Sequence, residues 1–197
     1  MLPQQPIDDR VEIDSVEWIF QPDWPGLRLI ARCEGGVVHL TDATGAPTDD
    51  PGFATALGRA LGAETATVDG VWTARGTVEE DGGALPAFVA IDLLELDGEA
   101  LLDVPFQERR RLLESILPEG PAVRLGPIVK QPLAGSFAAW REAGFTHYLA
   151  RHQNARYHPG AEDDSWLRIP IEAPGPTPGF VQHVVGSRRG RRRRIRD

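Results

Sequence analysis

Apolar and polar positions along this chain form many short runs, most of them the length of a β-strand and bounded by Gly, Pro or Asp. Such runs, rich in β-branched and aromatic residues, favour strands, and Glu-Gly-Gly at residues 34–36 is typical of a hairpin turn. The strands on either side of that turn, and the last two strands, are expected to pair antiparallel. We predict strands over residues 15–20, 27–33, 36–42, 64–76, 87–98, 123–130, 146–152 and 165–171.

Three segments instead place apolar residues along one helical face, namely residues 51–62, 105–117 and 136–144. Two of these segments begin with proline, which suits the first helical turn because the N–H there needs no partner within the helix. Two end at a glycine. Because strands come in groups with helices inserted, without strict β-α alternation, we predict a mixed, mainly antiparallel α+β domain.

The last part of the chain differs in composition from the rest, so we expect one domain over residues 1–171 and a Pro/Gly linker with an Arg-rich tail over residues 172–197. The tail arginines are Arg188, Arg189, Arg191, Arg192, Arg193, Arg194 and Arg196. Without them and Asp197, the formal charge of −8 becomes −14 for residues 1–187. The tail is therefore expected either to contact DNA or another polyanion, or to fold back on the acidic body.

Composition narrows the class of protein. The apolar fraction of 41% is that of a soluble globular chain, and no apolar run reaches the length of a membrane helix. The N-terminus lacks the pattern of a secretory signal, and the single cysteine, Cys33, fits a reducing compartment, so we expect a cytoplasmic protein without membrane contact. Lys130 is the only lysine, which leaves one candidate for any chemistry that needs a lysine amine.

The most specific pattern is FVAIDLLELDGEALLDVPFQERRRLLESIL, residues 88–117. It resembles the middle of the adenylation domain of ATP-dependent DNA ligases, where Asp-Leu-Leu and Leu-Asp-Gly precede a Pro-x-x-Glu-Arg-Arg helix. YHPG and SWLRI within residues 157–169, PDWPGLRLIAR at residues 22–32 and TVDGVW at residues 67–72 are similar to further motifs of that family, in the same order. The resemblance implies the antiparallel-sheet nucleotidyltransferase fold that these ligases share with mRNA capping enzymes. It also implies that the OB-fold domain of the family is missing, because too few residues follow Ile169.

In that family a lysine amine attacks the α-phosphorus of ATP, and a divalent metal and cationic side chains neutralise the charge that develops. The resemblance places Asp23 at the position of this lysine and Pro25 at the aspartate of the same motif, while Gly26 and Arg28 match it. Further departures are Asp42 for a nucleotide-binding arginine, Val71 for the glutamate of Asp-Gly-Glu, Ile91 for the ring that stacks on adenine, Thr146 and Arg151 for the glutamate and lysine of Glu-Gly-x-x-x-Lys, and Arg168 and Pro170 for two phosphate-binding lysines.

The resemblance therefore implies a ligase fold without ligase chemistry. On this interpretation the chain has no catalytic residue and no cofactor, and ATP and Mg²⁺ are expected only if the family activity survives. It would act as an accessory module in DNA repair, in contact with DNA or with a repair protein. One alternative is a nucleotide-binding or nucleotidyltransferase enzyme that works without lysyl-AMP, and another is an adaptor that binds neither nucleotide nor DNA.

Four other groups have both a chemical and a structural interpretation. Lys130 is either a relocated nucleophile or a surface lysine. Asp92, Glu95 and Asp97 form either an acidic metal site or a strand end and turn. Trp24 and Trp72 either fill the former nucleotide pocket or belong to the core. The last group contains histidines and aspartates that would form a metal site if they converge, and it comprises His147, His152, His158, Asp163 and Asp164.

Overall fold

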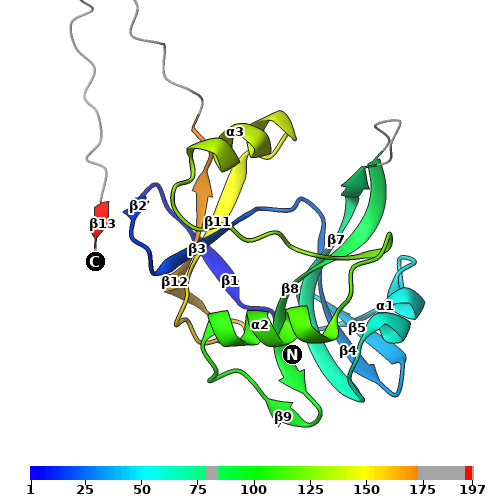
Figure 1. Ribbon diagram of the computed structural model, residues 1–197. Helices are drawn as coiled ribbons and strands as arrows, with labels where there is room; N and C mark the ends of the chain where they lie inside the picture. The colour runs from blue at the N-terminus through cyan, green and yellow to red at the C-terminus, as the bar shows by residue number, and fades with distance from the viewer. Residues whose placement is uncertain (79–83, 173–193, 197) are drawn as a thin grey trace, which may run out of the picture.

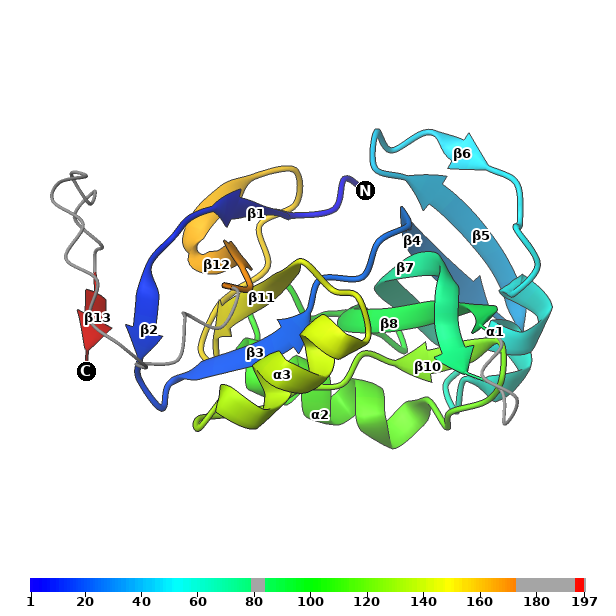
Figure 2. The same ribbon diagram turned by 90° about the horizontal axis from the view of Figure 1, so that it is seen from above.

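The computed structural model describes residues 1–78, 84–172 and 194–196. Two sheets form its framework, and they lie side by side in Figures 1 and 2. The smaller sheet has the strand order β1-β12-β11-β3, and the larger one has the order β10-β8-β7-β4-β5-β6, with β9 paired to β8. Most neighbouring strands are antiparallel, as predicted, whereas the pairs β1/β12 and β10/β8 are parallel.

The predicted strands and helices are present, with shifted ends. The described strands are β1 Gln5–Asp8, β2 Glu12–Asp14, β3 Trp18–Pro22, β4 Leu27–Glu34, β5 Val37–Asp42, β6 Pro47–Thr48, β7 Thr65–Val78, β8 Ala84–Leu96, β9 Glu99–Ala100, β10 Val123–Leu125, β11 His147–His152, β12 Glu162–Pro170 and β13 Arg194–Arg196. The helices are α1 Ala54–Ala60, α2 Phe106–Ile116 and α3 Ala134–Glu142.

One strand prediction is wrong in its length. The segment predicted over residues 123–130 is a strand only at β10, beside β8 in the larger sheet. Pro127 has no N–H to donate, and the chain leaves this sheet there. Val129 then forms a single antiparallel bridge with Phe20 of β3, so this segment connects the two sheets.

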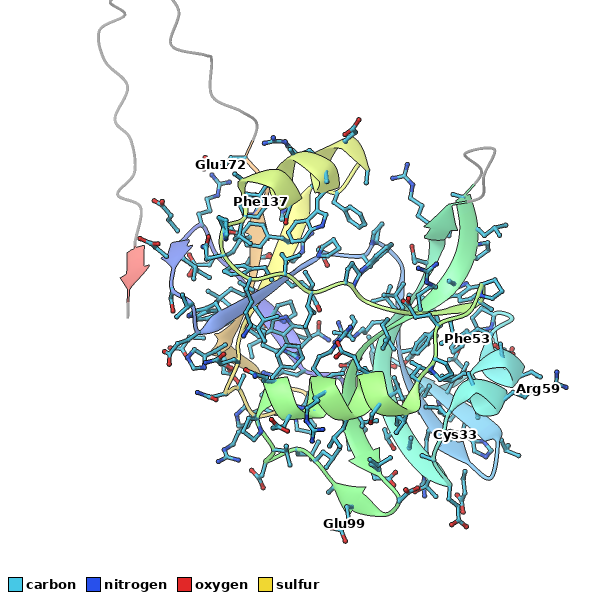
Figure 3. All side chains as sticks on the ribbon, in the orientation of Figure 1. Cys33, Phe53, Arg59, Glu99, Phe137 and Glu172 are labelled. Atoms are coloured by element: carbon cyan, nitrogen blue, oxygen red, sulfur yellow. The ribbon has the colours of Figure 1, made fainter. Side chains whose placement is uncertain are left out.

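Each sheet has its own hydrophobic core. Helices α1 and α2 pack on one face of the larger sheet, where buried side chains include Cys33, Phe53 and Leu113. Helix α3 covers the smaller sheet, whose core contains Trp140 and Tyr148. Phe137 of α3, labelled in Figure 3, packs against this core. Phe106, at the start of α2, contacts Ile19 of β3, so α2 touches both sheets. Cys33 lies on β4 and is buried, with 1% of its surface exposed.

Only a small part of the predicted linker and tail, residues 172 and 194–196, lies within the described residues. Arg188, Arg189, Arg191, Arg192 and Arg193, and most of the predicted linker, lie outside the described residues. Arg194 and Arg196 form the ends of strand β13, which pairs with β2. Among the described residues, no helix combines the length and apolarity needed to cross a membrane.

Candidate functional site

Charged side chains gather on the face of the larger sheet that is turned away from α1. Successive residues of a strand point to opposite faces, so the alternation that sends Leu29 and Val68 into the core sends Arg28 and Asp69 to the other side. There Arg28 meets Trp166, from β12 of the smaller sheet, and its guanidinium carbon lies 5.0 Å from the centroid of the tryptophan ring. The candidate site is therefore built by strands of both sheets.

Arg28 of the PDWPGLRLIAR segment and Asp69 of the TVDGVW segment bind each other. Arg28 donates from Nε and Nη2 to the two carboxylate oxygens, each at 2.6 Å, and the Tyr157 hydroxyl donates to Oδ2 of Asp69 at 2.8 Å. Burial alone would lower the pKa of Arg28, but Asp69 outweighs it and raises that pKa. Burial and the same carboxylate raise the pKa of Tyr157. Both oxygens of Asp69 are thus occupied by internal donors.

Asp92 forms a second buried cluster with two arginines. Arg109 of α2 donates to both of its oxygens, at 2.8 and 2.7 Å, and Nη1 of Arg151 donates to Oδ2. The Arg151 guanidinium lies 3.6 Å from the centroid of the Trp166 ring, and burial lowers the pKa of Arg151 to about 10. Burial alone would raise the pKa of Asp92, but the two arginines outweigh it and lower that pKa.

The acidic metal-site hypothesis for this strand end is wrong. The arginines neutralise Asp92, and Glu95 accepts hydrogen bonds from the hydroxyls of Thr65 and Thr67. Asp97 accepts from the backbone N–H groups of residues 64 and 65 and has a φ of 48°, as a turn residue does. These carboxylates close the strand and its turn, as the structural interpretation predicted.

At the position that the resemblance assigns to the nucleophile, Asp23 follows β3 directly. Its carboxylate accepts a hydrogen bond from Nε of Arg168 on β12 at 2.7 Å, and its N–H donates to the carbonyl of His147 at 3.1 Å. Nη1 of Arg168 also donates to Asp8 at 3.2 Å. The side chains of Asp23 and Arg168 are 26% and 34% exposed, so this pair lies at the surface end of the site. A cavity of about 450 Å³ beside it is lined by Asp8, Asp9, Arg10, His147, Arg168 and Pro170.

The other positions assigned by the resemblance are dispersed. Val71 and Ile91 are buried, with 6% and 1% of their surface exposed. Thr146 is exposed before β11 and lies next to His147. Asp42 caps its own turn by accepting from Thr44 and Ala46, so it does not face the site.

The remaining motif positions are Pro170, at the end of β12, and Pro25 and Gly26, which follow Asp23 in the link between β3 and β4. Pro170 pairs with His147 across β12 and β11. Pro25 and Gly26 are exposed in the link between β3 and β4. A Cβ at Gly26 would come within 2.1 Å of the Trp72 carbonyl oxygen, so glycine is needed there for close packing of the backbone.

The two tryptophans of the pocket-filling hypothesis behave differently. Trp72 stacks on Phe53, with ring centroids 5.3 Å apart, within the core on the other face of the sheet. For Trp72 the pocket-filling prediction is therefore wrong and the core interpretation correct. Trp24 is half-buried and packs edge-on against Phe145, with ring centroids 4.9 Å apart.

Metal ligands do not converge in the part of the chain that the structure describes. No group of three His, Cys, Asp or Glu side chains there is placed to hold a metal ion. His152 lies 3.4 Å from Glu17, and His158 lies 3.5 Å from Asp163, so the histidines contact different partners. The histidine hypothesis is wrong. A divalent metal of the kind that the resemblance implies does not fit either, since Asp69 is occupied by internal donors and the side chains at the two other positions that the resemblance assigns to carboxylates, Val71 and Thr146, carry no carboxylate.

Sequence reasoning missed the role of Arg109 and Tyr157, which complete the two buried clusters. A signal for Arg109 exists in the sequence. It lies on the same stripe of α2 as the buried residues Phe106 and Leu113, where an apolar side chain is expected. Lys130, by contrast, is exposed in the segment that follows β10.

Comparison with known proteins places this geometry in context. No family model matches the chain. The multifunctional non-homologous end joining protein LigD of Mycobacterium bovis is 29% identical over 171 residues, which cover 79% of this chain and 22% of that protein. A DNA ligase of Thermococcus onnurineus is 34% identical over 82 residues, which cover 40% of this chain and 15% of the ligase. The chain thus spans about a fifth of the length of LigD.

The fold of this chain is similar to those of solved DNA ligase structures. The crystal structure of the ligase domain of M. tuberculosis LigD matches with a TM-score of 0.69 and 26% identity, over 85% of this chain and 58% of that one. A Chlorella virus DNA ligase-adenylate matches in fold, with a TM-score of 0.52 and 13% identity, over 83% of this chain and 68% of the other.

Proposed function

Because the chain is homologous to the ligase domain of LigD and has the fold of a DNA ligase adenylation domain, we propose that it is a member of this family that has lost nucleotidyl transfer. The observation that supports this proposal best is the ion pair between Asp23 and Arg168 at the position of the nucleophile. On this view, residues 1–171 are the adenylation-like domain and residues 172–197 are a linker and tail.

The chemistry of that position supports the proposal. A carboxylate cannot form the phosphoramidate that a lysine amine forms with AMP. It also repels the phosphates of ATP, by about 4 kcal/mol at a separation of ~4 Å and an effective dielectric constant of ~20. Asp23 in turn accepts a hydrogen bond from Nε of Arg168 and Asp8 accepts one from Nη1, so two carboxylates of the chain occupy this cation.

The two buried clusters, around Asp69 and around Asp92, are a second observation that supports this proposal. Asp69 and Asp92 bind arginines of the chain itself, and Arg151 is stacked on Trp166 with its charge directed at Asp92. A ligand would have to displace these contacts, at the cost of unpaired buried charges. The interior is therefore neutralised largely by its own side chains.

The biological role that we propose is that of an accessory module in DNA repair. It rests on the named roles of the relatives, which are DNA ligases and a non-homologous end joining protein. We further propose that DNA or a repair protein is the partner, with the Arg-rich tail as a contact, and that the protein is cytoplasmic, which fits its single buried thiol.

An adenylation assay tests the loss of activity. The chain is incubated with α-³²P-ATP and Mg²⁺ or Mn²⁺, denatured, and examined for protein-bound label, with the M. tuberculosis LigD ligase domain as the positive control. We expect no label on the wild type. Label that disappears in Lys130→Ala would overturn the proposal and identify the nucleophile. Label that is released by hydroxylamine and lost in Asp23→Asn would instead indicate an acyl-adenylate on Asp23.

A further inference from the structure

Strand β13 pairs with strand β2 at the edge of the molecule. The pairing is parallel, and its register places Arg194 beside Glu12, Ile195 beside Ile13, and Arg196 beside Asp14. Within the described residues these two strands form a separate two-stranded sheet (Figures 1 and 2). Residues of the tail thus lie against a segment from the start of the chain.

The β2 segment is well suited to receive another strand. Ile13 is only 5% exposed and packs in the core of the smaller sheet, and its carbonyl accepts a hydrogen bond from the Gln131 side chain at 2.9 Å. β2 is therefore anchored to the domain through its central residue. Glu12 and Asp14, on either side of Ile13, are exposed. Since β2 has no other strand partner among the described residues, its backbone offers hydrogen bonds to an added strand.

The charges of the two segments are complementary. Acid, isoleucine, acid in β2 lie in register with arginine, isoleucine, arginine in β13. Asp8 and Asp9 precede β2 along the chain, and Arg10 is the only basic residue among residues 8–14, which carry four acids. A basic segment is attracted to such an edge, and salt weakens the attraction, because the Debye length shortens from about 10 Å at 0.1 M to about 3 Å at 1 M.

We infer that β2 is a docking strand for the Arg-rich tail, and that a polyanion must compete with this edge for the same arginines. The pairing itself does not depend on the proposed function, whereas the competition rests on the proposed contact between the tail and nucleic acid. A tail held in this way would bind DNA more weakly than a free one.

Hydrogen exchange of the full-length chain tests the docking. The variant Ile195→Pro removes the N–H at the centre of β13, and Val185→Pro places the same residue earlier in the tail as a control. We expect exchange of the peptide containing Glu12–Asp14 to rise about tenfold in Ile195→Pro, which corresponds to about 1.4 kcal/mol of opening free energy, and to stay unchanged in Val185→Pro. Equal exchange in wild type and Ile195→Pro would overturn the docking.

The contribution of charge is tested separately. The double variant Glu12→Gln and Asp14→Asn keeps the shape of β2 and removes its two acids, while Asp49→Asn with Asp103→Asn removes the same charge at exposed positions elsewhere. Faster exchange of β2 only in the first variant, and in the wild type at high salt, supports electrostatic docking. If β2 exchanges at the same rate in the two double variants, electrostatic docking is contradicted.

A short intact DNA duplex then probes the competition. Addition of the duplex to the wild type is expected to raise exchange at β2 to the level of Ile195→Pro, and that variant is expected to bind the duplex more tightly. If the duplex binds while β2 stays protected, the competition is refuted. If the duplex does not bind at all, the proposed DNA contact fails, and the docking is still decided by Ile195→Pro alone.

Discussion

Replacement of Asp92 by asparagine is the most direct test of the buried charge cluster. The side chains of Asp92 and Arg109 are 0% exposed and that of Arg151 is 5% exposed. Asparagine keeps the shape of the side chain but leaves two buried arginines without a counterion. Removal of one partner from a buried ion pair costs about 3–5 kcal/mol. We therefore expect Asp92→Asn to lower the free energy of unfolding by that amount, measured by urea denaturation with tryptophan fluorescence.

The dependence on pH distinguishes this charge effect from a packing defect. The arginines lower the pKa of Asp92 in the folded protein, so its ionised form contributes stability above the unfolded pKa of about 3.9, and this contribution is lost as pH falls through the lowered folded value. The difference between wild type and Asp92→Asn should be constant at neutral pH and shrink below about pH 4. Asp103→Asn, at a side chain that is 98% exposed, is the control. A loss below about 1 kcal/mol, or a difference that does not change with pH, would refute the reasoning.

Three further substitutions test other parts of the structure, each by the free energy of unfolding. Leu113→Ala empties a fully buried position of α2 and should cost about 2–5 kcal/mol; a smaller loss would contradict its place in the core. Tyr157→Phe removes the hydroxyl that donates to Asp69 and should cost about 1–3 kcal/mol, whereas an unchanged urea midpoint would mean that water replaces this contact. Asp23→Asn breaks a partly exposed pair with Arg168 and should change stability by less than about 1 kcal/mol; a larger loss would show that the pair supports the fold.

The sequence predicted most of the framework because burial has a different period in strands and helices. The short apolar run in residues 27–33 and the one-sided stripe in residues 105–117 each depend on local pattern alone, and they form a strand and a helix as predicted. β10 was predicted too long because Val123 and Val129 are both strand-like, although they pair with different sheets. Pairing across the chain leaves no such local signal.

The site was predictable only in part, and for a similar reason. Motif spacing located Arg28 and Asp69, but it could not show that they bind each other and Tyr157. Nor could it assign Trp72 to the core, since the motif alone does not show which of the two faces of β7 packs against the helices. The partner of Asp23, Arg168, lies at the other end of the domain sequence and became evident only from the fold.

The opposite charges of Asp23 and Arg168 give these two side chains a contact within the chain itself. In the family that the chain resembles, both positions are lysines, and two cations side by side repel each other unless phosphate lies between them. Here the carboxylate takes the place of that phosphate. It outweighs the burial of Arg168, which alone would lower the pKa of this arginine, and raises that pKa. The end of β12 and the residue that follows β3 are therefore linked by an ion pair within the chain, and because the pair is partly exposed, its contribution to stability is expected to be small.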